Sequence, residues 1–187
     1  GVGAQKLAEA FYFIASSGFK GAAAMKVLEV SAKASAAGMG EVQTIADAVT
    51  SAINAYGHGN LSAARATDIL MKTIQVGKAE PEALARSLGR IMPVSAQLGV
   101  SLGQVGGAIA GLTLTGLSSA EAVTALRGTM IALVAPAKMS IDELKRVGTS
   151  YQEITGIIRD KGLLPALEFL RQKTDGNMLS MRKIIPN

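Results

Sequence analysis

His58 is the one histidine of this sequence, and it stands between Gly57 and Gly59. A histidine acts as a general base in a Ser-His-Asp triad, or as a metal ligand, when suitable partners converge on it. The sequence has no cysteine and no second histidine, so neither a disulfide framework nor a His/Cys metal site can form. Flanking glycines favour a turn, and we interpret His58 as a turn residue with no metal.

Two pairs of carboxylates could support hydrolysis if their members faced each other across a cleft. The pairs are Glu80 with Glu82, and Asp142 with Glu143. Both stand where we expect helices to begin, and acidic side chains stabilise the positive end of the helix dipole. We therefore expect structural roles for these carboxylates and no catalytic residues.

Glycine-rich loops bind phosphates when a lysine and a helix start follow the glycines. The glycines between Gly99 and Gly111 are not followed by Lys-Ser or Lys-Thr, and no strand is expected before them. Gly77-Lys78 is followed by alanine and glutamate and fails the same test. We expect no cofactor, no small-molecule substrate and no enzymatic activity.

The most informative segment lies between Arg90 and Glu121, which carries no charge. Within it glycine recurs every fourth residue, at Gly99, Gly103, Gly107 and Gly111. This spacing places a smooth stripe on one helix face, where another backbone can approach or a membrane can be entered. The sequence thus predicts either a buried helical hairpin or a membrane-insertion segment at these four glycines.

Residues 94–117 are long enough to cross a bilayer, but they include six serine, glutamine and threonine side chains and a break at Gly99-Val100-Ser101. These features favour the buried hairpin over a stable single span. A helical domain that refolds into a membrane after release remains a hypothesis that combines the two interpretations.

The composition favours closely packed helices, because 49% of residues are hydrophobic while only 4% are aromatic. We predict an all-α fold of about eight to ten helices, arranged as stacked hairpins or a bundle. One helix is expected over 80–98 with a kink or break at Pro93, and a glycine-rich helix over 101–115, capped by Ser101. Inward stripes are expected at three sets of positions: Leu7, Ala8, Phe11, Tyr12 and Ile14; Met25, Leu28 and Ala32; and Val42, Ile45, Ala46, Val49 and Ile53.

A loose internal repeat supports the hairpin arrangement. Similar helical segments begin at Glu41, Pro81 and Ser119, about 40 residues apart, which suits stacked helical hairpins. We expect a hairpin core over 1–138 and short C-terminal helices over 139–187 that pack on it or extend from it. The first residue is glycine rather than methionine, so we expect a piece of a longer protein.

The net charge of +5 is spread along the chain, which is typical of a solvated surface. The densest basic stretch comprises Arg171, Lys173, Arg182 and Lys183. Basic residues do not recur at one position of each repeat, so we expect no specific nucleic-acid binding.

The order of motifs resembles the core region of phage tail tape measure proteins. Residues 11–57 and 69–138 carry the resemblance through SSGF, EVQT, NAYG, GKAEPE, QLGVSL, TGLSSAEA and APAK, in that order. The segments GLLPALEFL (162–170) and MRKIIPN (181–187) resemble the part that follows in that family. The resemblance covers almost the whole chain and adds no catalytic residue.

The resemblance implies a structural protein of a phage or prophage tail that lies in the lumen of the tail tube and helps set its length. The implied partners are the tail tube protein, tail assembly chaperones and further copies of the chain as a homo-oligomer. The host inner membrane is an expected partner on infection, since such proteins leave the tube ahead of the DNA. The chain would thus visit the host cytoplasm during assembly, the virion, and the host envelope. The alternative is a soluble helical-repeat module that binds a peptide or protein.

Overall fold

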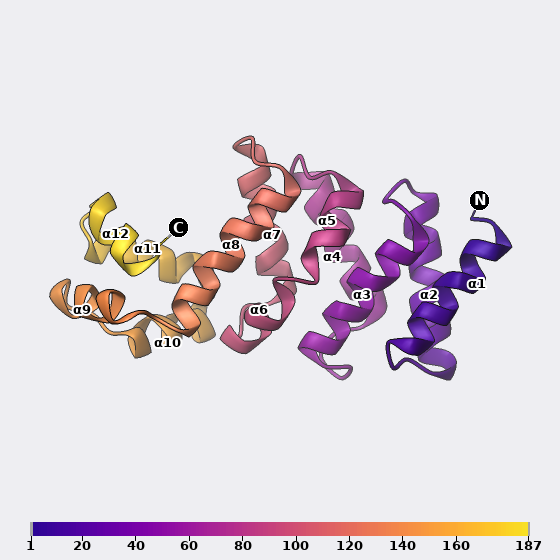
Figure 1. Cartoon of the computed structure of the whole chain (residues 1–187), viewed down its shortest axis with the longest axis horizontal. Coiled ribbons are helices and arrows are strands. Elements are labelled where there is room, and N and C mark those ends of the chain that lie inside the picture. The colour runs from indigo at the N-terminus through magenta and orange to yellow at the C-terminus, as the bar shows by residue number, and fades with distance from the viewer. Residues whose placement is uncertain (1, 187) are drawn as a thin grey trace.

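The computed structural model describes residues 2–186, which form helices and no strand (Figure 1). The all-α prediction is confirmed. The described helices are α1 (Ala4–Ser16), α2 (Gly21–Ala36), α3 (Val42–Tyr56), α4 (Ala63–Val76), α5 (Pro81–Leu88), α6 (Met92–Leu98), α7 (Leu102–Leu114), α8 (Ser119–Val134), α9 (Lys138–Arg146), α10 (Tyr151–Lys161), α11 (Leu163–Lys173) and α12 (Met178–Ile184).

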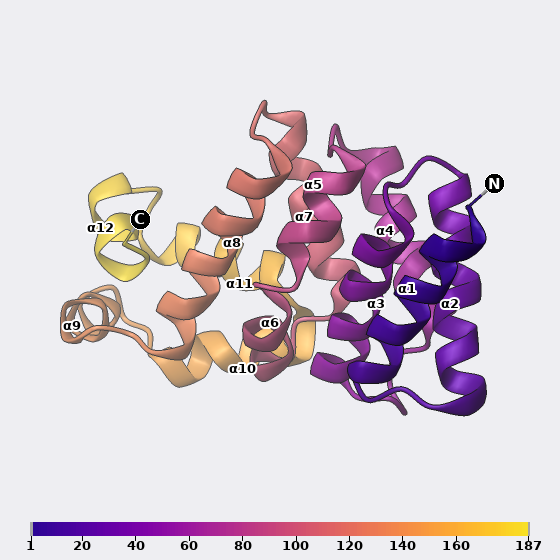
Figure 2. The same ribbon diagram turned by 45° about the vertical axis from the view of Figure 1, so that its right-hand side comes forward.

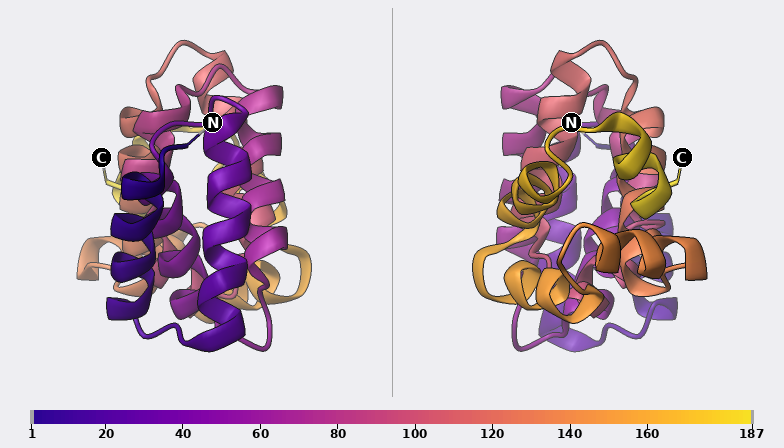
Figure 3. Two further views of the ribbon diagram at one scale, coloured as in Figure 1. Left: turned by 90° about the vertical axis from the view of Figure 1, so that its right-hand side faces the viewer. Right: turned by 90° about the vertical axis from the view of Figure 1, so that its left-hand side faces the viewer.

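The first eight helices form two layers that run along the long axis of the molecule (Figures 1 and 3). In the first layer α1 packs on α3, α3 packs on α5 and α6, and these two pack on α8. In the second layer α2 packs on α4, and α4 packs on α7. The repeat starts seen in the sequence therefore correspond to successive helices of the first layer.

The last four helices leave this pattern. α9 packs against α12, and α10 packs against α11. One cluster of buried apolar side chains nevertheless extends from Ile14 in α1 to Ile184 in α12. The division of the chain at residue 138 remains a prediction.

Side-chain caps explain why several helices begin where they do. Ser62, Ser101, Ser118 and Ser150 each accept a hydrogen bond from the backbone N–H three residues later, which satisfies a donor that the helix leaves free. At Ser101 and Ser118 the third residue bonds back to the cap, completing a capping box. Gly99 ends α6 in the left-handed conformation, with φ +77°, as expected for the break before α7.

Three local expectations need correction. The helix expected over 80–98 is two helices, and the break falls at residues 89–91 rather than at Pro93. Pro93 lies in the first turn of α6, where its missing N–H costs no helical hydrogen bond.

The inward stripes expected for α1 and α2 are also wrong in part, whereas the stripe of α3 is confirmed. In α1 the buried residues are Ala10 and Ile14, and Tyr12 is 78% exposed. In α2 Met25 is 56% exposed, and the buried stripe is shifted by one position to residues that include Ala24 and Val27. α1 and α2 form the end of the array, so neighbours cover only one side of each helix.

Candidate functional site: surfaces around α7

His58 lies exposed in the turn between α3 and α4. Its ring packs on Phe19, with ring centroids 4.8 Å apart. Phe19 itself is buried and follows α1. His58 therefore has a packing contact in the turn where the sequence placed it. Among residues 2–186 no group of three or more His, Cys, Asp or Glu side chains could hold a metal ion.

Glu80 and Glu82 join neighbouring repeats instead of facing each other. Glu82 Oε2 accepts a hydrogen bond of 2.9 Å from the backbone N–H of Glu41, at the start of α3. Thr44 Oγ1 donates to the other carboxylate oxygen over 3.0 Å. Burial favours the neutral form of Glu82, but the bonds from Glu41, Arg86 and Thr44 together outweigh it and lower the pKa of the carboxyl.

Glu80 makes the equivalent connection from α5 to α8, the next helix of the first layer. It accepts a hydrogen bond of 3.0 Å from Ser119 Oγ, at the start of α8. Hydrogen bonds from its own backbone N–H and from Ser119 lower the pKa of Glu80. The two glutamates at the start of α5 thus hold the N-terminal ends of three first-layer helices together, a role that sequence spacing alone did not identify.

The second carboxylate pair is split between solvent and the interior. Asp142 is exposed, while Glu143 is buried between α9 and α12. Arg146 bonds Glu143 over 2.6 Å and reaches Ser180 of α12 over 2.8 Å. The hydrogen bond from Arg146, supported by Ser180, lowers the pKa of Glu143 to about 2. This arrangement fastens α12 to α9.

The basic stretch of the sequence does not form one patch with a single role. Arg171 makes two hydrogen bonds to Glu168, of 2.8 and 2.7 Å. Lys173 donates to the backbone carbonyl of Gly148, and Lys183 lies 3.6 Å from Glu143. Arg182 is exposed on α12.

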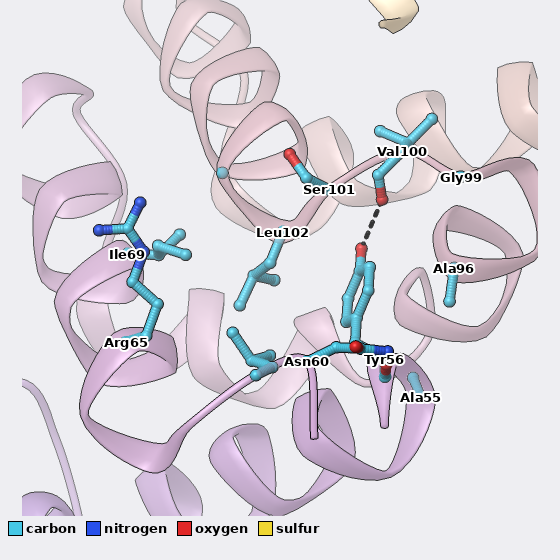
Figure 4. Close-up of a pocket in the computed structure, with 12 residues that line it drawn as sticks. Ala55, Tyr56, Asn60, Arg65, Ile69, Ala96, Gly99, Val100, Ser101 and Leu102 are labelled. Carbon is cyan, nitrogen blue, oxygen red and sulfur yellow. Dashed lines mark hydrogen bonds between the residues drawn. The ribbon is translucent and has the colours of Figure 1, made fainter. Parts of the chain in front are cut away.

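A first groove, of about 510 Å³, lies at the N-terminal end of α7 (Figure 4). The Tyr56 hydroxyl donates to the carbonyl of Val100 over 2.9 Å, and burial raises the pKa of Tyr56 to about 12. Arg65 is the charged side chain among the residues that line this groove, with Asn60 and Ser101 as polar neighbours. The lining includes no carboxylate and no histidine, so it offers no acid–base pair near neutral pH.

Three of the four stripe glycines share one face of α7, but that face is exposed. Gly99 lies at the end of α6, and Gly103, Gly107 and Gly111 lie on the outer face of α7. A Cβ atom added at Gly107 or Gly111 would meet no heavy atom within 4 Å. Within the described chain no helix packs on these two glycines, so the buried-hairpin expectation is not met there, and membrane insertion stays a prediction.

The close contacts between α4 and α7 occur at two other glycines. A Cβ added at Gly77 would lie 2.6 Å from Thr113 Oγ1 and 2.8 Å from the Cα of Ala110 in α7. A Cβ added at Gly106 would collide with Thr73 Oγ1 of α4. The packing of α4 against α7 therefore depends on Gly77 and Gly106. No regular glycine spacing in the sequence marked either residue.

A second groove, of about 580 Å³, lies on the open side of α7, and we call it the α7–α11 groove. Its walls come from α7, α8 and the start of α11, and no charged side chain lines it. The residues that line it are Gln104, Gly107, Ala108, Gly111, Leu112, Thr115, Ala125, Leu126, Thr129, Leu163, Leu164, Pro165 and Leu167.

Among residues 2–186 no single helix is long and apolar enough to cross a membrane. α8 and α9 pass the same test as a pair, but the two helices meet at a bend of 77°.

The helices therefore form a two-layer array of repeats in which Glu80, Glu82 and Glu143 connect one helix to another. Comparison with known proteins assigns the array to a family: the chain belongs to the phage-related minor tail proteins, a family that matches residues 1–185. The chain is also similar to the protein named "Tape measure protein" of Pneumococcus phage Dp-1, with 24% identity over 153 residues. No solved structure matches the chain.

The matched region covers 82% of this chain but only 13% of the Dp-1 protein, so the chain spans a small part of that relative. Family membership gives the chain a structural role in a phage tail. Family membership also argues against the alternative of a helical-repeat module that is unrelated to phages.

Proposed function

We propose that this chain is a tape measure segment that helps set the length of the tail tube during assembly. The similarity to the Dp-1 tape measure protein carries the proposal. The fold is compatible with it, because the two ends of the described chain lie apart along the array, and the repeats follow one another along the long axis (Figure 1). Such an array can stand in series with further segments of a longer protein.

The test is an in-frame deletion of residues 1–187 from the full-length gene, with tail length measured by electron microscopy. An α-helix rises 1.5 Å per residue, so a segment that formed one continuous helix would account for about 280 Å of tail length. Stacked helices lie about 10 Å apart, so a folded array would account for far less. Shortened tails support the proposal, and the amount of shortening separates the extended state from the folded one.

The matched control replaces the segment with an unrelated helical sequence of equal length. Restored tail length would mean that the segment acts through its length. Tails of unchanged length after the deletion would overturn the length-setting role. Such tails combined with lost infectivity would point to a role in delivery instead.

A second role, entry into the host envelope after release from the tube, is favoured by the uncharged surface of α7. Leu114 is 52% exposed there beside the open glycines. Each of α6 and α7 is too short to span a bilayer alone. Insertion would therefore require the two helices to leave the array and enter the bilayer together. Leakage of dye-filled anionic vesicles on addition of the chain supports this role, and absence of both leakage and lipid binding between pH 4 and pH 8 overturns it.

A further inference from the structure

The second layer of the array ends at α7, although the first layer continues to α8. A further second-layer helix would lie beside both α7 and α8. α11 does not take that place, since it runs crosswise behind α8 in Figure 2. The α7–α11 groove occupies the position that the next helix of the layer would fill.

We propose that the α7–α11 groove is a docking site for an amphipathic α-helix of a partner polypeptide, with aliphatic side chains on one face and carboxylates toward α12. This inference does not depend on the length-setting role. A helix docked in the groove would continue the second layer, because α4 already packs on the other side of α7 through Gly77 and Gly106.

The shape of the groove suits a helix. Gly107 and Gly111 leave open space above the α7 backbone, so a helix can approach α7 closely. Leu164 stands on the opposite wall and is 69% exposed, and Leu167 lies next to it. Aliphatic side chains of a docked helix would cover these leucines, as in other complexes of a helix with an apolar groove.

The apolar surface continues toward α12 and ends in arginines. A neighbouring groove of about 670 Å³ shares Thr129, Leu164 and Leu167 with the α7–α11 groove. Met178 in its wall is 69% exposed, and a flexible methionine adapts to the shape of a partner.

Arg171 and Arg182 line this end of the surface, and Glu168 is bonded to Arg171. Among the described residues no carboxylate lies within ion-pair distance of Arg182. A partner with carboxylates at this end therefore gains a charge pair that fixes its direction.

Charge also distinguishes such a partner from a second copy of this chain. If a second copy of this chain filled the groove, the docked helix would be its α2, which is the exposed end helix of the same layer. Its solvent-facing charges are Lys26, Glu29 and Lys33, with two lysines for one glutamate. These would meet arginines at the α12 end, so an acidic partner helix fits better.

The test measures binding of a fluorescein-labelled designed helix of about 18 residues, with leucines on one face and two glutamates at one end. The substitution Gly111→Leu fills the groove from the α7 wall, and we expect it to weaken binding by about tenfold or more. Gly128→Leu is the matched control, because Gly128 is an equally open helical glycine on α8 outside the groove. We expect Gly128→Leu to change affinity by less than about twofold.

Leu164→Glu, on the opposite wall, gives a second variant if Gly111→Leu loses its helical circular dichroism. Arg182→Glu tests direction: it is expected to weaken the glutamate peptide and strengthen a matched peptide with lysines in place of the two glutamates. Equal effects of Gly111→Leu and Gly128→Leu, or no saturable binding, would overturn the proposal. Two other results would also overturn the proposal. One is a dimer, seen by sedimentation, that Gly111→Leu abolishes and that the peptide leaves intact. The other is vesicle binding that Gly111→Leu abolishes and that the peptide leaves unchanged.

Discussion

α3 and α7 are both apolar helices inside the array, yet their surroundings differ. α3 contacts α1, α2, α4, α5 and α6, and eight of its residues are buried. α7 contacts α4, α6 and α8 and leaves Gly107 and Gly111 open. The helix without charges is thus the less covered of the two. A missing charge indicates an apolar environment or an apolar partner, and it does not by itself indicate burial.

The largest expected difference concerns side-chain truncation. Ile45 of α3 is fully buried, so Ile45→Ala removes packing and leaves a cavity, and we expect a loss of about 3 kcal/mol in the free energy of unfolding. Leu114→Ala on the open face of α7 is expected to cost about 0.5 kcal/mol. Urea unfolding followed by circular dichroism compares the two, and equal losses would mean that α7 is covered in solution.

The next difference lies within α7 itself, between neighbouring glycines. Gly106→Ala forces a contact with Thr73, so we expect a loss of about 1–3 kcal/mol. Gly107→Ala meets open space and improves helix propensity, so we expect a gain of up to about 1 kcal/mol. Thermal unfolding of both variants measures the difference, and a reversed order would contradict the assignment of the α4-facing side of α7.

Gly77→Ala examines the same interface from the α4 side. The added methyl group would meet the Cα of Ala110 at 2.8 Å, and backbone atoms cannot rotate away as a side chain can. We expect a loss of about 2 kcal/mol, measured by urea unfolding. Gly128→Ala, at an open position on α8, is the control and is expected to be neutral or stabilising.

The smallest expected difference concerns pH at the two helix starts. Glu82 contributes stability while it is ionised, so its contribution is present above the ordinary pKa of 4.5 and is lost as pH falls through its lowered value. The cap of α7 consists of Ser101 and Gln104, which do not titrate. We expect Glu82→Gln and Ser101→Ala each to cost about 1 kcal/mol at pH 7.

At pH 3 the cost of Glu82→Gln is expected to shrink while that of Ser101→Ala persists. Urea unfolding of both variants and the parent chain at the two pH values provides the measurement. A cost of Glu82→Gln that does not change with pH would mean that this carboxylate does not hold the start of α3.

Several helix boundaries could be read from the sequence because they depend on local chemistry, although the break between α5 and α6 was misplaced at Pro93. Ser101 caps the helix that follows it, and the break before that helix falls at Gly99, as predicted. The buried stripe predicted for α3 is also confirmed, because neighbouring helices on several sides bury every position of its apolar pattern. The partial failures were in α1 and α2, where burial depends on which side of an end helix is covered.

The sequence by itself thus determined the class of fold, the period of about 40 residues and the face shared by Gly103, Gly107 and Gly111. It could not determine whether that face is covered, because covering depends on where α4 and α11 lie, and both are distant in sequence. Only the tertiary structure assigned the close contact to Gly77 and Gly106, and the helix-fastening roles to Glu80 and Glu82. Each of these roles needs a partner between 33 and 41 residues away in the sequence, which local spacing does not specify.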